Sequence, residues 1–166
     1  MKHLLLTSLL LVLSLSAAGQ TSTQTIDFRI NGVGHGSTPA VIARKLGKPR
    51  RSKDVREPGD DSCFSEAHTF RTVNYTGLEL SLIGDGKGRK LRVYEIEVKS
   101  AKWLVSGIRV GADMAGVRSV LGKPREEFER DATTTWYYEN KGQTADVSFE
   151  FIKGRLVRIL MAESLC

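Results

Sequence analysis

Cysteine and histidine are scarce in this sequence, and their scarcity limits the metal and redox chemistry open to the chain. The 166 residues include two cysteines and three histidines. A structural metal site usually takes four Cys, His, Asp or Glu ligands. The one cluster of such residues is Asp60, Asp61, Cys63, Glu66 and His68, and no second His or Cys pair completes a ligand set there. We therefore expect neither a metal nor any other cofactor.

Residue patterns of catalysis are also missing. Ser65, Ser81 and Ser106 lack the nucleophile-elbow context, and few histidines are present to activate a serine. Residues 84–90, Gly-Asp-Gly-Lys-Gly-Arg-Lys, lack the pattern of a phosphate-binding loop and precede a strand pattern rather than a helix. We expect a hairpin turn there and a chain that is not an enzyme.

One long apolar run is present, at the N-terminus. Lys2 precedes the run Leu4–Leu15, and the small residues of Ala17-Ala18-Gly19 follow it. This order is typical of a secretory signal peptide, and the run is short for a bilayer core of about 30 Å. Residues 1–19 are predicted to be removed, leaving Gln20 first. No cysteine follows the run to accept a lipid, so we expect a periplasmic or secreted chain without a lipid anchor.

Export bears on the two cysteines, Cys63 and Cys166. Thiols of exported proteins meet oxidising conditions in which they pair. A single disulfide between the two is the natural pairing, and two free thiols are the alternative.

Positive charge is in excess, with a formal net charge of +6. It is dense in residues 44–56, where Arg50, Arg51, Lys53 and Arg56 are candidate anion-binding residues. Such a surface permits binding to lipopolysaccharide, a wall polymer, nucleic acid or an acidic protein face, and it does not select among them. The interspersed Asp and Glu also fit an ordinary solvated surface. We do not expect nucleic acid as the partner.

A five-residue sequence, Leu-Gly-Lys-Pro-Arg, occurs at residues 46–50 and again at 121–125. A helix pattern precedes each copy. Thr38 and Asp113 are favoured N-cap residues, and Gly47 and Gly122 suit the left-handed position that follows a helix. The sequence predicts one short helix before each copy.

Alternating apolar residues predict three strands after each helix. The first three are Phe70–Tyr75, Leu78–Ile83 and Leu91–Val98, and the second three are Thr134–Glu139, Ala145–Ile152 and Leu156–Met161. Residues 51–67 are predicted to be a long loop. The predicted fold class is α+β, with two tandem helix plus three-stranded antiparallel units, residues 20–99 and 100–166, forming one joint sheet with the helices on one face.

Two sequence features carry a resemblance to a known family. The pattern Gly-x-Asp/Thr-x-Ala-x-Val-x-x-x-Leu-Gly-x-Pro precedes an aromatic strand, Trp136-Tyr137-Tyr138, and a hairpin that ends in Lys-Gly-Arg-Leu-Val-x-Ile. This order resembles the SmpA/OmlA family of outer-membrane assembly lipoproteins, and two such units in tandem resemble the secreted β-lactamase inhibitory protein family. The resemblance implies an inhibitor-like role in which Asp85, the acid of the first hairpin loop, enters a partner's active site.

The aromatic strand also predicts a protein-binding face. Trp136 and Tyr138 alternate to one face of a sheet and Tyr137 to the other, so at least one of them lies outside the core. Together with Tyr94 they are candidate partner contacts, and core packing is the alternative for each. His35, between two glycines, is interpreted as structural punctuation before the helix.

The function predicted from the sequence is that of an exported, non-enzymatic protein-binding module of the bacterial envelope or secretome. The alternative is a binder of an anionic envelope polymer or lipid through the basic loop surface.

Overall fold

A computed structural model describes residues 25–59, 64–142 and 145–165 of the chain. Within these residues, strands predominate and the helices are short. None of the described helices is long and apolar enough to cross a membrane. The elements are β1 (Thr25–Ile26), α1 (Pro39–Leu46), β2 (Arg51–Glu57), β3 (His68–Tyr75), β4 (Leu78–Asp85), β5 (Arg92–Val98), α2 (Met114–Leu121), β6 (Glu126–Arg130), β7 (Thr133–Asn140), β8 (Ala145–Ile152) and β9 (Arg155–Glu163).

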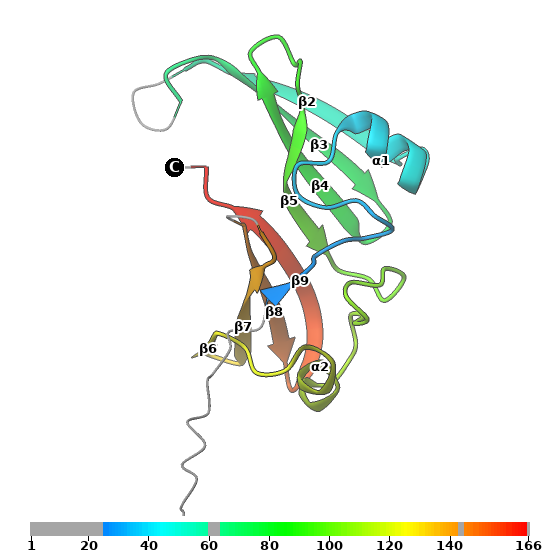
Figure 1. Cartoon of the computed structure of the whole chain (residues 1–166), viewed down its shortest axis with the longest axis vertical. Coiled ribbons are helices and arrows are strands. Elements are labelled where there is room, and N and C mark those ends of the chain that lie inside the picture. Colours follow the sequence, from blue (N-terminus) through cyan, green and yellow to red (C-terminus); the bar gives the residue numbers. More distant parts are fainter. Residues whose placement is uncertain (1–24, 60–63, 143–144, 166) are drawn as a thin grey trace, which may run out of the picture.

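The strands form one sheet in the order β1-β7-β8-β9-β5-β4-β3-β2, with β6 paired to β7. All pairs are antiparallel except β1 with β7, so the sheet is mixed. Figure 1 shows β2–β5 in the upper part of the sheet and β6–β9 in the lower part. The pairing of β5 with β9 joins these two parts.

This architecture corrects the predicted fold class. The described chain is one large mixed sheet of nine strands with two short helices, rather than two α+β units of a helix and three strands. The SmpA/OmlA assignment, the tandem-repeat description and the likeness to β-lactamase inhibitory proteins are wrong for this sheet-rich fold. The predicted signal peptide, residues 1–19, lies outside the described residues, as do Cys63 and Cys166 of the predicted disulfide.

Two edge strands account for part of the error in the predicted fold class. Residues 51–57 were predicted to be loop but form β2, and β6 was not predicted at all. Every residue of β2 and of β6 is exposed. Because neither face of these strands is buried, their sequences carry no apolar alternation by which they could be recognised.

The two helices begin and end where the sequence predicts. Asp113 caps α2 by accepting a hydrogen bond from the Gly116 amide at 2.7 Å, whereas Thr38 precedes α1 in an extended conformation without a side-chain cap. Gly47 and Gly122 follow the helices with φ of 75° and 74°, a backbone conformation that favours glycine. The termini are therefore set by local sequence.

A tyrosine holds the end of each helix against the sheet. The Tyr75 hydroxyl on β3 donates to the Gly47 carbonyl at 3.0 Å, and the Tyr138 hydroxyl on β7 donates to the Gly122 carbonyl at 3.0 Å. Each bond satisfies a carbonyl that the helix end leaves unpaired. The contact of α1 with β3 and the contact of α2 with β7 thus have the same geometry.

One core lies against one side of the sheet. It includes Leu80 and Leu82 of β4, Ile96 of β5, Phe149 of β8 and Met161 of β9. Helix α1 contributes Ile42 to it, and α2 contributes Val117 and Leu121.

The alternate strand positions point to the other side of the sheet, here called the open face. They are partly or fully exposed apart from Ile83 and Ser148. The open face includes Arg51, Lys53, Val55, Phe70, Thr72, Ser81, Ile83, Tyr94, Glu95, Glu97, Phe128, Thr135, Tyr137, Ser148, Glu150, Arg158 and Leu160.

Candidate functional site

Aromatic side chains form two separate pairs on the open face. The rings of Phe128 on β6 and Tyr137 on β7 meet edge to face, with 5.7 Å between their centroids. The rings of Phe70 on β3 and Tyr94 on β5 also meet edge to face, at 6.1 Å. Phe128 is 56% exposed. Exposed aromatic rings of this kind are enriched at the energetic centres of protein interfaces.

A charged network lies between the two aromatic pairs. Arg158 of β9 contacts Glu97 of β5 at 2.6 Å and Glu150 of β8 at 2.8 Å. One guanidinium therefore links three adjacent strands across the open face. Because Glu97 is only 17% exposed, this ion pair is less screened by solvent than an ordinary surface pair.

Glu95 lies beside this network without an ion pair of its own among the described contacts. Its carboxylate accepts a hydrogen bond from the Ser81 hydroxyl at 3.4 Å. Burial raises the pKa of Glu95 above its ordinary value, and the nearby carboxylates of Glu97 and Glu79 add to the rise. A cation brought to this position from outside would stabilise the ionised form.

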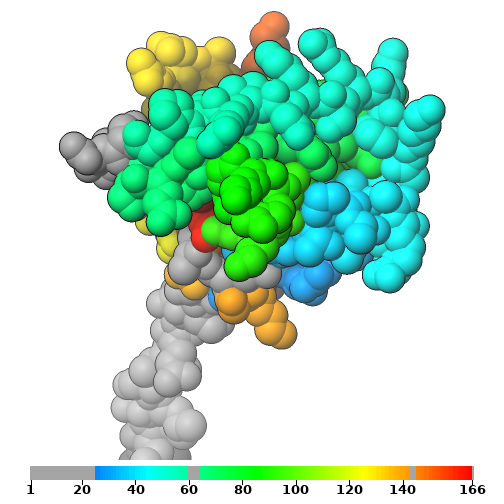
Figure 2. Space-filling view, turned by 90° about the horizontal axis from the view of Figure 1, so that it is seen from above, coloured from blue at the N-terminus to red at the C-terminus, as the bar shows by residue number. Residues whose placement is uncertain are grey.

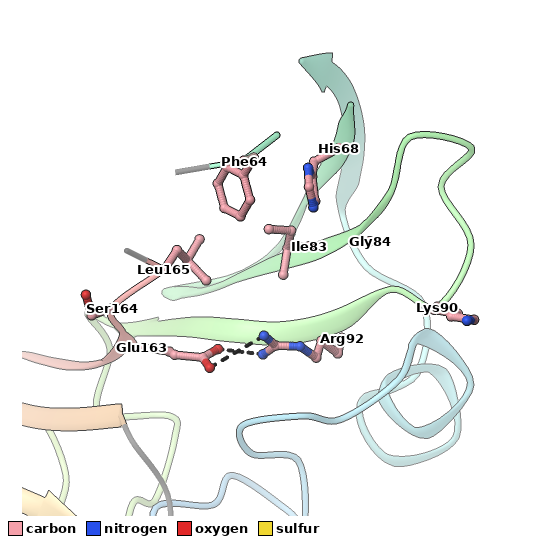
Figure 3. Close-up of a pocket in the computed structure, with 9 residues that line it drawn as sticks. All are labelled: Phe64, His68, Ile83, Gly84, Lys90, Arg92, Glu163, Ser164 and Leu165. Carbon is pink, nitrogen blue, oxygen red and sulfur yellow. Dashed lines mark hydrogen bonds and ion pairs between the residues drawn. The ribbon is translucent and has the colours of Figure 1, made fainter. Parts of the chain in front are cut away.

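A pocket of about 300 Å³ opens where β5 and β9 diverge. The ladder between these strands covers only Glu95–Val98 and Ile159–Ala162. Beyond it, the chain segment that follows β9 turns toward the ends of β3 and β4 (Figure 3). In Figure 2 the red C-terminal segment lies recessed beside the green β4–β5 turn. The pocket is lined by Phe64, His68, Ile83, Gly84, Lys90, Arg92, Glu163, Ser164 and Leu165.

Glu163 is the centre of an ion cluster at the floor of this pocket. Arg92 donates to its carboxylate at 2.5 Å, as Figure 3 shows, and His35 Nε2 lies 2.9 Å from the same oxygen. Burial acts to raise the pKa of Glu163, but the hydrogen bonds from Arg92 and His35 outweigh it, and the pKa lies below its ordinary value. The carboxylate is thereby held in its ionised form.

The cluster joins three segments of the chain, and its carboxylate is not tuned as a general base at neutral pH. A general base needs a pKa near the working pH, and the pKa of Glu163 is displaced in the opposite direction. His35, Arg92 and Glu163 come from the segment before α1, from β5 and from the end of β9. Within residues 25–59, 64–142 and 145–165, no group of three His, Cys, Asp or Glu side chains is placed to hold a metal ion.

The predicted partner-binding residues are divided between the core and the surface. Trp136 and Tyr138 are 1% and 0% exposed, so they pack in the core and cannot contact a partner in the folded chain. Tyr137 and Tyr94 lie on the open face, as described above. Asp85 lies in the β4–β5 turn, where its carboxylate accepts hydrogen bonds from the backbone of Lys87 and Arg89 and is occupied within the turn.

The predicted anion-binding residues lie on and beside the exposed edge strand β2. Arg50, Arg51, Lys53 and Arg56 are all exposed. Figure 2 shows this part of the chain, in cyan, as a rim from which long side chains project. Arg71 of β3, by contrast, is held by two hydrogen bonds of 2.7 Å to Asp54.

Comparisons with known proteins give little further information. No protein-family model matches the chain, and no curated protein matches it in sequence. Among solved structures, it is similar to an extracellular protein containing a SCP domain from Bacillus anthracis str. Ames, with a TM-score of 0.44 and 11% identity over 78% of this chain. The match covers 44% of that protein, less than half of its length. A likeness this low supports no inference about function.

Replacement of Glu163 by Gln is expected to lower stability near neutral pH by about 1–2 kcal/mol, because an ionised, hydrogen-bonded carboxylate is lost. Since the pKa of Glu163 is lower in the folded chain than its ordinary 4.5, its contribution is present above that value and disappears as the pH falls through the folded pKa. Urea unfolding of both chains at several pH values measures this. The wild-type advantage should shrink in acid, and an advantage independent of pH would contradict the role of the charge.

Proposed function

We propose that the chain is an exported, non-enzymatic module that holds a protein partner on the open face. The observation that carries the proposal is the exposure of large apolar side chains on this side of the sheet, with Phe128 at 56% and Val55 at 43%. The two aromatic pairs lie on different parts of the face, and a charged network separates them. Export is proposed from the N-terminal apolar run and the small residues that follow it.

The partner is proposed to present a basic side chain to the middle of the open face. Glu97 and Glu150 pair there with Arg158, Glu97 also pairs with Lys99, and Glu95 lies beside them. Among the described residues, the hydrogen-bond partner of Glu95 is the Ser81 hydroxyl. A lysine or arginine from the partner would pair with Glu95 while the aromatic rings contact apolar surface on either side, an arrangement in which charge provides specificity and the rings provide affinity.

Site-specific photocrosslinking tests this surface. A benzoylphenylalanine placed at Phe128 or at Tyr137 is expected to yield one discrete adduct in the cells that produce the chain. Val120 of α2 is the matched control, because it is an apolar residue 51% exposed and lies outside the open face. A probe there should give no such adduct. Glu95→Gln should reduce the yield from Phe128, because the partner's basic residue loses its counter-charge.

The same adduct from all three positions, or none from any, would contradict the proposed surface. Mass spectra of the recovered chain test export separately, since a processed chain begins at Gln20. A chain that retains residues 1–19 in its functional form would contradict export and leave the binding result unaffected.

A second candidate function is binding of an anionic polymer through β2. The specific observation in its favour is that all seven residues of β2 are exposed and that Arg51, Lys53 and Arg56 lie within it. Binding of this kind depends mainly on charge and weakens steeply as salt rises.

Exchange of Arg51, Lys53 and Arg56 for Gln should then abolish salt-sensitive binding to lipopolysaccharide in a sedimentation assay. The matched control exchanges Lys87, Lys123 and Lys141 for Gln, which removes the same charge from exposed positions elsewhere. If both triple variants lose binding equally, only the net charge matters and β2 is not a site.

A further inference from the structure

The two helix–strand contacts provide an internal comparison within one chain. The Tyr75–Gly47 and Tyr138–Gly122 hydrogen bonds are both 3.0 Å long, so Tyr75 corresponds to Tyr138 and Gly47 to Gly122. In each contact, the glycine amide donates to the carbonyl four residues earlier, which belongs to Ala43 in α1 and to Arg118 in α2. Ala43 therefore corresponds to Arg118. Two residues before each tyrosine, Val73 corresponds to Trp136.

The α2 contact is filled by an aromatic ring. Trp136 is 1% exposed, and its ring lies 4.8 Å from that of Phe151. The Arg118 guanidinium covers it at 4.6 Å from the ring centroid. Among the described residues, the buried Trp136 Nε1 has no hydrogen-bond partner, so this space accepts an indole without a polar contact.

The α1 contact has small residues at both corresponding positions and is hollow. Val73 and Ala43 take the places of the tryptophan and the arginine, and both line a pocket of about 140 Å³. Its polar surface is small, and its apolar walls include Pro39, Ile42, Pro49 and Leu82. A cavity of roughly 150 Å³ lined by aliphatic side chains is large enough to bind benzene in another protein.

A guanidinium tethered to the edge strand is present in both contacts. Arg118 is held by Glu127 of β6 at 3.3 Å, and Arg71, which lines the pocket at α1, is held by Asp54 of β2 at 2.7 Å. In the α2 contact the Arg118 guanidinium lies over the Trp136 ring, a favourable cation–π arrangement, and Arg71 offers a guanidinium to a ring bound in the pocket at α1.

We infer that the pocket between α1 and β2–β4 is a binding site for a single uncharged aromatic ring, an indole or a phenyl group. The site has apolar walls like those of the α2 contact and a tethered guanidinium that comes from β3 rather than from the helix, and no ring fills it. Val73 points to the core side of β3, away from the open face, so this site is independent of the function proposed above.

Two probes distinguish a free aromatic compound from a ring carried on a polypeptide. Indole and N-acetyl-tryptophan amide are each titrated into the full chain, and binding is followed by backbone amide shifts in NMR spectra. Indole is expected to give saturable shifts at α1 and β3. Comparable binding of the amide would assign the ring to a polypeptide, and binding of indole alone would assign it to a small molecule.

Two variants close the site in different ways. Val73→Trp supplies the missing ring from within, and Ala43→Leu covers the exposed mouth with a residue that also favours helix. Each should weaken indole binding by about tenfold or more, because the ring loses most of its buried contact. Val55→Trp, on the open face, is the matched control and should leave indole binding unchanged.

Ala43→Leu keeps the test decisive if Val73→Trp does not fold, because Ala43 is an exposed helix position. Indole shifts that fail to saturate, or that map away from α1 and β3, would overturn the inference. So would a folded Ala43→Leu chain that binds indole as tightly as the wild type.

Discussion

The short ladder between β5 and β9 is the contact on which the rest of the structure depends. Four residue pairs, from Glu95 with Ala162 to Val98 with Ile159, join the strands that follow α1 to those that follow α2. Ile96, Met161 and Ile159 in this ladder are fully buried, so the same residues that carry the backbone pairing also close the core. Because the ladder is continuous, the open face extends over both parts of the sheet and presents its two aromatic pairs to one side.

Ion pairs support the ladder at both of its limits. Arg158 links Glu97 to Glu150 over the open face, and Arg92 with His35 holds Glu163 where the strands diverge. Segments distant in the sequence are brought together by these contacts, since His35 and Glu163 are separated by 128 positions. The candidate sites consist of carboxylates held by cations and of aromatic pairs on the open face.

Local features were predictable from the sequence, and features that depend on the sheet were not. Both helices and the six apolar strands could be located, because caps, glycines and alternation are encoded by neighbouring residues. The sequence predicts a loop at edge strand β2 because none of its residues is buried, and the predicted fold class is wrong in part for this reason. The sequence correctly predicts that Trp136 and Tyr138 point to one face of the sheet and Tyr137 to the other. It does not show which face is buried, because that depends on residues elsewhere in the chain. No local pattern marked Glu163, whose partners Arg92 and His35 are remote.

Amide hydrogen exchange across the β5–β9 ladder tests the continuity of the sheet most directly. If β5 and β9 form one cooperative unit with their neighbours, the amides of Ile96 and Ile159 should exchange as slowly as those of Leu80 and Val147, in the interiors of β4 and β8. Faster exchange at Ile96 and Ile159 than at both of these positions would contradict the account, because the two parts of the sheet would then open independently.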